Sequence, residues 1–248
     1  MIRWLVASSL ALPVPQGLLH RSEQEQWQSL CHPKRRREWL LGRWAAKRLL
    51  QATFKESLGL APPLNCLVIR NDSYGVPDAM LDLGGVCWEL PVAISISHSG
   101  EYAVSASAWD SSGKIGVDLE RIEPRAQGFI HAYFRDLEIH QVLEVPPGER
   151  DLAITTIWSA KESALKAAGL GLSVDTRSVT CRIDTPCKGL QSWTPFAIDW
   201  NMSDRFERGD GSQENQICVQ AERFPRLRGY WRVFESYVIT LAVPAPLQ

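Results

Sequence analysis

The most constraining stretch of this sequence runs from Ile157 to Gly169 and reads IWSAKESALKAAG. Alanine, leucine, lysine and glutamate favour helices, and glycine commonly ends them, so the stretch predicts a helix that stops at Gly169. Trp158, Glu162 and Lys166 are spaced four residues apart and therefore share one face of that helix. An exposed Glu–Lys pair contributes only about 0.2–0.5 kcal/mol, so this face alone is also compatible with an ordinary surface helix.

A second pattern lies upstream, in the sequence KIGVDLE at residues 114–120. Apolar residues occupy every second position, which is typical of a strand, and Asp118 and Glu120 therefore project from one face. Two such carboxylates repel each other unless a cation or water lies between them. Oxygen ligands that bridge to phosphates suit Mg²⁺, and a third carboxylate would join them if Glu162 reaches the same place. The alternative is a solvent-facing polar edge.

A basic helix is predicted for residues 34–50, after a shorter acidic helix with Ser22 as its N-cap. Arg36, Arg43 and Lys47 fall on one stripe of the basic helix, with an apolar stripe beside it. Runs of like charge are usually solvated surface, so the stripe by itself does not establish a binding site.

Residues 93–100, AISISHSG, alternate like a strand that enters a turn. The adjacent Ser97 and His98 suggest a hydrolase, but the G-x-S-x-G elbow of hydrolases is absent. Neighbouring side chains on a strand also point to opposite faces, so this pair does not predict nucleophilic catalysis.

Composition limits the class of protein. The 248 residues are 45% hydrophobic with a net charge of −1, which indicates a globular chain without general attraction to nucleic acid or membranes. The first residues favour a strand ending near Pro13 over a signal peptide, and no apolar run has the roughly 18 residues of a membrane span. The six cysteines have no C-x-x-C spacing, which predicts buried thiols in a reducing, cytoplasmic setting.

The strand and helix motifs together resemble the two-part signature of the 4′-phosphopantetheinyl transferases. That signature is roughly [IV]-G-[IV]-D, followed at a characteristic separation by [FW]-[ST]-x-K-E-[SA]-x-x-K, and this sequence meets every defined position. Residues 95–100 and the chain length are similar to those of the larger, monomeric Sfp-type branch. The resemblance extends approximately from Pro33 to Leu172.

The resemblance implies an α+β fold, a pseudo-dimer of two similar α/β halves with the active site in the crevice between them. Residues 1–110 would form the half that binds the nucleotide and phosphates of coenzyme A. Residues 111–248 would carry the metal and the catalytic helix. Sequence order supports a duplication, since a basic helix and then a Lys-Glu helix each precede predicted strands.

The implied activity is Mg²⁺-dependent transfer of 4′-phosphopantetheine from coenzyme A to a serine of an apo acyl- or peptidyl-carrier protein, with release of adenosine 3′,5′-bisphosphate. Asp118, Glu120 and Glu162 would hold the metal, and Glu162 and Lys166 would serve catalysis. The residues expected to contact coenzyme A are Arg36, Arg43, Lys47, Ser97, His98 and Lys161.

One departure from the family pattern concerns Val76, which stands where the family often has a phosphate-binding lysine in Gly-Lys-Pro. Another base would have to supply that contact. Two other functions remain compatible with the sequence. The chain could be a catalytically altered module that binds coenzyme A or a carrier protein, or another coenzyme A-dependent transferase such as an acetyltransferase.

Overall fold

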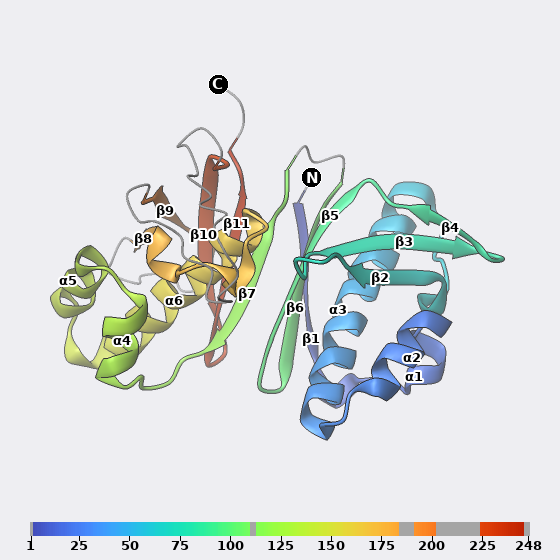
Figure 1. Ribbon diagram of the computed structural model, residues 1–248, viewed down its shortest axis with the longest axis horizontal. Coiled ribbons are helices and arrows are strands. Elements are labelled where there is room, and N and C mark those ends of the chain that lie inside the picture. The colour runs from blue at the N-terminus through green and yellow to red at the C-terminus, as the bar shows by residue number, and fades with distance from the viewer. Residues whose placement is uncertain (1, 110–112, 184–190, 202–223, 246–248) are drawn as a thin grey trace, which may run out of the picture. The chain divides into compact units, whose positions relative to one another are not determined.

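The computed structural model divides into two compact units, Met1–Leu119 and Glu120–Gln248, so the boundary lies beyond the expected division after residue 110. Each unit combines helices with antiparallel sheets, which confirms the α+β class (Figure 1). The residues that the structure describes are 2–109, 113–183, 191–201 and 224–245.

The first unit holds one long helix and two three-stranded antiparallel sheets, with strand orders β1-β6-β5 and β2-β3-β4. Its helices are α1 (Pro15–Leu18), α2 (Arg21–Ser29) and α3 (Pro33–Leu58). Its strands are β1 (Ile2–Ser8), β2 (Leu67–Asn71), β3 (Pro77–Leu83), β4 (Val86–Glu89), β5 (Val92–Ser99) and β6 (Tyr102–Trp109).

Local sequence explains the limits of α3. Pro33 occupies its first turn, where a missing N–H costs nothing, and Gly59 ends it with φ of 68°. Helix α3 then packs against β1, β2, β5 and β6. The shorter α2 begins differently from our expectation, because its N-cap is His20 rather than Ser22. The His20 ring accepts the backbone N–H of Ser22, and the Glu23 carboxylate accepts the N–H of His20.

The second unit repeats this order, since a short capped helix precedes a long helix and antiparallel strands follow. Its helices are α4 (Gln127–Tyr133), α5 (Asp136–Glu144) and α6 (Arg150–Ala167). Strand β7 (Gly116–Arg121) crosses the unit boundary. The strands that follow it are β8 (Val179–Ile183), β9 (Thr194–Trp200), β10 (Leu227–Phe234) and β11 (Tyr237–Pro244). The sheet order is β7-β11-β10-β9-β8, and α6 packs on β8, β10 and β11.

The end of α6 confirms the predicted stop at Gly169, whose φ is 73°. The N–H of Gly169 reaches the carbonyl of Lys166 across 2.9 Å, and that of Leu170 reaches Leu165 across 3.0 Å, which is the Schellman arrangement. The apolar residues between Val174 and Ile183 predict a strand over that range, but β8 starts only at Val179, because a 3-10 turn at Thr176–Ser178 precedes it. Alternating apolar residues also predict a strand at residues 217–221, which lie outside the described residues.

The cysteines match the expectation of buried thiols only in part. Cys181 is buried, whereas Cys31 and Cys87 are exposed and Cys66 is half-buried. The thiols of Cys187 and Cys218 lie outside the described residues. Among the described residues, no helix is both long enough and apolar enough to cross a membrane.

Candidate functional site

A cavity of about 440 Å³ in the first unit brings together two predicted coenzyme-binding residues, Arg43 on α3 and His98 on β5. Gly42 explains how the helix and the strand come so close. A Cβ atom at Gly42 would lie 3.1 Å from the Ile96 side chain, tighter than most real contacts, so a larger residue would push α3 away from β5. The other residues lining this cavity are Arg35, Glu38, Trp39, Asn71, Gly75 and Pro77.

Arg43 is held on three sides. One Nη donates to Asn71 Oδ1 at 2.9 Å, the guanidinium lies 4.5 Å from the centre of a Trp39 ring, and Nε lies 3.8 Å from Glu23 Oε1. Burial lowers the pKa of Arg43, and the nearby Glu23 carboxylate partly offsets that effect. Because a guanidinium stays protonated even so, the cavity wall carries a fixed positive charge that suits a phosphate.

The strand β5 separates its neighbouring polar residues, as the sequence predicted. His98 lines the cavity, while the Ser97 hydroxyl donates to Asp118 Oδ1 at 2.7 Å. Ser97 therefore contacts a carboxylate of the proposed metal set, and the expected contact of Ser97 with coenzyme A remains a prediction.

Two of the residues predicted to contact phosphates, Arg36 and Lys47, do not line this cavity. Lys47 is fully buried, and its Nζ donates to the carbonyl of Leu18 at 2.8 Å and to the Glu23 carboxylate. Burial lowers the pKa of Lys47, with Glu23 opposing that effect. Arg36 donates to the carbonyls of Leu30 and Gln28 at 3.1 and 3.0 Å, where α2 ends. Both cations therefore hold the fold rather than facing the cavity.

Sequence analysis missed two residues of this cavity, Arg35 and Trp39. The signal was present, because Arg35, Trp39 and Arg43 are spaced four residues apart and share one face of α3. Val76 lies between Gly75 and Pro77, which both line the cavity. Arg35 therefore lines the same cavity as the turn around Val76, where the family often has a lysine.

The second unit presents the other group of predicted residues on α6. Trp158 donates its indole Nε1–H to Glu120 Oε1 at 3.2 Å, and Arg125 donates to Glu120 Oε2 at 3.1 Å. Glu162, one turn beyond Trp158, is only 7% exposed, and Lys166 is half-buried a further turn along. The structure therefore brings Glu120 to the face of α6 that carries Glu162.

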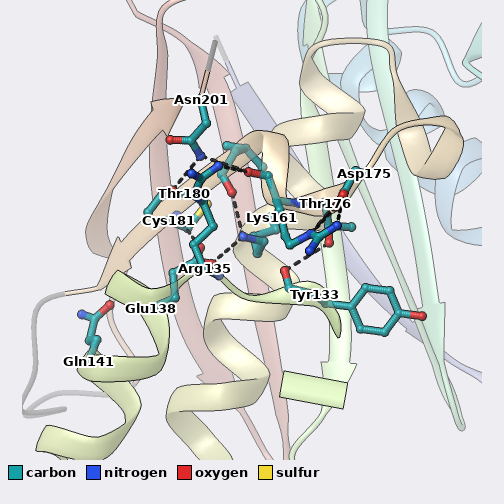
Figure 2. A network of polar contacts seen from close by, with 12 residues as sticks. Tyr133, Arg135, Glu138, Gln141, Lys161, Asp175, Thr176, Thr180, Cys181 and Asn201 are labelled. Carbon is teal, nitrogen blue, oxygen red and sulfur yellow. Dashed lines mark hydrogen bonds and ion pairs between the residues drawn. The ribbon is translucent and has the colours of Figure 1, made fainter. Parts of the chain in front are cut away.

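Lys161, which we expected to contact coenzyme A, lies in the core instead. Figure 2 shows its side chain directed at α5 and β8. Its Nζ donates to Glu138 Oε2 at 2.6 Å and to the carbonyl of Val179 at 2.7 Å, and both charged side chains are fully buried. The expected phosphate contact is therefore replaced by a buried ion pair.

The carboxylates predicted to hold a metal sit in different surroundings. Asp118 is 3% exposed on β7, and Glu120 is partly exposed two residues along the same strand. Within the described residues, no group of three or more His, Cys, Asp or Glu side chains forms a metal site by itself. Magnesium commonly uses one or two protein carboxylates and completes its shell with water and substrate phosphate, so carboxylates such as Asp118 and Glu120 are compatible with this ion by their chemistry.

Comparison with known proteins identifies a family. The sequence model of the 4′-phosphopantetheinyl transferase superfamily matches residues 114–241, just over half of the chain. The transferase Sfp of Bacillus subtilis strain 168 is 33% identical over 96 residues, 38% of this chain and 42% of Sfp. A holo-[acyl-carrier-protein] synthase of Staphylococcus aureus is 30% identical over 97 residues, 39% of this chain and 76% of the synthase.

Solved structures give weaker likenesses. A holo-(acyl-carrier-protein) synthase of Bacillus anthracis, in complex with CoA (3′,5′-ADP), is 23% identical, with a TM-score of 0.35 and coverage of 43% of this chain and 91% of that chain. The synthase of Thermotoga maritima is 19% identical, with a TM-score of 0.36 and coverage of 54% and 74%. The chain spans 38–48% of the first curated transferases that it matches. On the family match and its relatives, this chain belongs to the 4′-phosphopantetheinyl transferase superfamily, with Sfp-type members among its relatives.

Proposed function

We propose that this protein transfers 4′-phosphopantetheine from coenzyme A to a serine of an apo acyl- or peptidyl-carrier protein. The observation that carries the proposal is the cavity of about 440 Å³ with Arg43 and His98 in its wall. Its volume falls within the usual range for sites of small molecules and cofactors, and its fixed guanidinium suits an anionic ligand. Membership of the transferase superfamily supplies the reaction type.

The division of roles follows the two units. We assign the nucleotide and phosphates of coenzyme A to the N-terminal half, where Arg35, Arg43 and His98 line the cavity. Arg35 takes the part of the lysine that Val76 replaces. The proton and charge chemistry falls to the C-terminal half, on Glu162 and Lys166. The protein acts as a cytoplasmic monomer in this proposal, and residues of both halves serve one reaction.

The reaction balances as follows. The serine oxygen forms a bond to the β-phosphorus of coenzyme A, and the bond from that phosphorus to the bridging oxygen breaks. Adenosine 3′,5′-bisphosphate leaves with the electron pair of the broken bond. Glu162 accepts the serine proton directly or through water. Lys166, one turn along α6, offsets the negative charge that gathers on the phosphate oxygens.

Asp118, Glu120 and Glu162 would hold the Mg²⁺, which supplies charge stabilisation at the phosphates when it is bound. The other residues around these carboxylates orient them. Ser97 donates to Asp118, while Trp158 and Arg125 donate to the two oxygens of Glu120. Such partners fix the direction in which a carboxylate presents its remaining lone pairs.

The direct test is mass spectrometry of apo carrier proteins after incubation with the protein, coenzyme A and Mg²⁺. Carriers from fatty acid, polyketide and nonribosomal peptide synthesis should be compared. We expect a phosphopantetheine adduct on one serine of at least one carrier, and none on the serine-to-alanine carrier. Unmodified carriers throughout, with Sfp as the positive control, would reject the proposal.

Two alternatives give different results in the same assay. A coenzyme A-dependent acetyltransferase needs no carboxylate cluster, so its product would be an acetyl adduct that forms in excess EDTA. A catalytically altered binding module would retain coenzyme A in equilibrium dialysis yet modify no carrier. Asp118 is buried and Glu120 partly exposed, and the hydrogen-bond partners of both carboxylates favour the metal-dependent transferase over both alternatives.

A further inference from the structure

Three residues within one turn of helix α6, Trp158, Ser159 and Lys161, tie the helix to its unit through hydrogen bonds. Trp158 donates to Glu120 on β7. The hydroxyl of Thr240 on β11 bonds both the hydroxyl and the carbonyl of Ser159, at 2.9 and 2.8 Å. Lys161 bonds α5 and β8. Each residue bonds a different part of the unit. Together these bonds fix the rotation of the segment that ends at Glu162 about the helix axis and its position along that axis.

Figure 2 draws the tie through Lys161, whose side chain and that of its partner Glu138 are fully buried. Glu138 stands at its centre and uses both carboxylate oxygens. One oxygen accepts the ammonium of Lys161 at 2.6 Å and the backbone N–H of Arg135 at 2.9 Å. The other accepts the N–H of Cys181 at 2.8 Å. The pair therefore links the start of α5, the middle of α6 and the strand β8 at one point.

Stability alone does not account for such a pair. Removing two charges from water is costly, and apolar residues of similar volume often stabilise a core as well or better. An apolar contact is also non-directional and tolerates small sliding, whereas an ammonium bound to one carbonyl and one carboxylate does not. What the pair adds is a defined orientation of α6.

We propose that Glu138 and Lys161 are positioning residues that aim Glu162 in the reaction. Successive residues of a helix are about 100° apart around its axis, so the direction of Glu162 follows directly from where Lys161 is pinned. A misplacement of about 1 Å at a reacting group can reduce a rate about 10²-fold. The inference rests on the proposed function, since it assigns a purpose to that same site.

The first unit contains a matched arrangement that serves as an internal comparison. Lys47 on α3 donates to Glu23 on α2, and the other oxygen of Glu23 accepts the N–H of Ile69 on β2 at 3.0 Å. The residue one turn before Lys47 is Arg43, whose Nε lies 3.8 Å from Glu23. This pair therefore supports a residue of the cavity rather than Glu162.

The experiment compares Glu138→Gln/Lys161→Met with Glu23→Gln/Lys47→Met. Each double variant removes both charges of its buried pair, so neither leaves one charge of that pair alone in the core. Glu23→Gln/Lys47→Met also removes the carboxylate 3.8 Å from the Nε of Arg43, and this change acts on the cavity. We expect the first to lower kcat about 10- to 100-fold with little change in the KM for coenzyme A. We expect the second to raise that KM with little change in kcat. If the two pairs only stabilise the fold, then the folded molecules of both variants should have the kcat and KM of the wild type.

A second measurement needs no activity. Trp158 lies on the same helix as Glu162, and its indole N–H resonance, assigned with Trp158→Phe, reports its bond to Glu120 on β7. We expect Glu138→Gln/Lys161→Met to shift this resonance and Glu23→Gln/Lys47→Met to leave it in place. If the wild type modifies no carrier, the proposed function fails, while the resonance still decides whether the pair orients α6.

A milder variant covers the case in which a double variant does not fold. Glu138→Asp keeps the charge but withdraws the carboxylate by one methylene, so it should lower kcat less than the double variant while circular dichroism stays that of the wild type. Wild-type kcat together with an unmoved Trp158 resonance in any folded variant of the pair would overturn the proposal.

Discussion

The indole of Trp158 donates to Glu120 across 3.2 Å, so the first residue of the helix motif holds a carboxylate of the strand motif. The two motifs that the sequence presents separately are thus joined by a hydrogen bond. The ring of Trp158 is itself packed, with Phe129 and Tyr133 centred 5.0 and 5.1 Å away. The bond therefore starts from a fixed donor.

Trp158→Phe tests what this bond contributes. The variant keeps an aromatic ring but removes the donor to Glu120. Loss of a group that orients a metal ligand typically changes metal affinity or activity about 10- to 100-fold. We expect the Mg²⁺ concentration that gives the half-maximal rate to rise by about tenfold, which is the lower end of that range. Trp88→Phe, at a residue 60% exposed on β4, should leave the Mg²⁺ dependence unchanged.

Asp118 and Glu120 should differ in importance. Asp118 is 3% exposed, so its loss leaves a position that water reaches poorly, whereas Glu120 is partly exposed. We expect Asp118→Ala to abolish turnover and Glu120→Ala to reduce it less, since water can replace one Mg²⁺ ligand. Carrier modification measured across a series of Mg²⁺ concentrations checks this. Full activity of Asp118→Ala, or of the wild type in excess EDTA, would remove the metal from the proposal.

The cavity residues should govern the affinity for coenzyme A. We expect Arg35→Ala, Arg43→Ala and His98→Ala each to raise the KM for coenzyme A more than they lower kcat. Losing a charge-assisted hydrogen bond costs about 1.5–3 kcal/mol, which is roughly 10- to 100-fold. Arg36→Ala is the matched control, because its guanidinium bonds carbonyls at the end of α2. An equal effect of Arg36→Ala would show that charge on α3 acts only at long range.

Comparison with dephospho-coenzyme A identifies which of these residues meets the 3′-phosphate. The residue that contacts it should lose, on substitution, the preference of the wild type for coenzyme A. We expect this result for His98→Ala. If His98→Ala discriminates against dephospho-coenzyme A as strongly as the wild type, then His98 has another role at the cavity.

Glu162→Gln separates catalysis from support. The variant keeps the shape of the side chain at a site 7% exposed but loses the charge and the base. Because general base catalysis accounts for roughly 10²–10⁴ in rate, we expect turnover to fall by at least about 10²-fold. Thermal melting on the same sample should stay close to that of the wild type. Near-normal turnover would mean that this face of α6 is only scaffold.

Alkaline pH should weaken the second unit through Cys181. Burial raises the pKa of the Cys181 thiol well above its ordinary value of 9.0, with Glu138 adding to the rise and Lys161 opposing it. Above pH 9.0 the unfolded thiol therefore loses its proton while the folded thiol keeps it. The folded state then binds more protons, so the free energy of unfolding falls with rising pH, by at most about 1.4 kcal/mol per pH unit.

Cys181→Ala isolates this effect, because it removes the thiol and leaves the other titrating groups in place. We expect the stability advantage of the wild type over Cys181→Ala to shrink between about pH 8 and about pH 10 in urea titrations. A constant difference across this range would show that the folded thiol ionises at its ordinary pKa.

Local sequence patterns correctly predicted the structural features that depend only on residues close together in the chain. The helix that ends at Gly169, the strand that contains Asp118, and the opposite faces of Ser97 and His98 all follow from spacing along one element. The α+β class came from the resemblance to the transferase family, and the order of helices and strands agrees with it.

The direction of the lysines could not be predicted in the same way. Spacing shows which residues share a helix face, but burial of that face depends on partners elsewhere in the sequence. Lys47 meets Glu23, 24 residues earlier, and Lys161 meets Glu138, 23 residues earlier. Nothing near either lysine marks it as a core residue. Arg35 was not predicted, because the neighbouring Arg36 fitted the proposed basic stripe with Arg43 and Lys47 equally well. Spacing alone does not show which of the two arginines faces a cavity.

The contacts of Glu23 and Glu138 with strand amides bear on how each unit unfolds. Each carboxylate bonds the long helix on one oxygen and the N–H of Ile69 or Cys181 on the other. If the strand alone detached, the carboxylate would lose its bond to the strand N–H while the lysine paired with it stayed buried. We therefore expect helix docking and sheet formation to be coupled in one cooperative event, so that amide exchange at Ile69 and Cys181 should report the opening of a whole unit rather than local fraying.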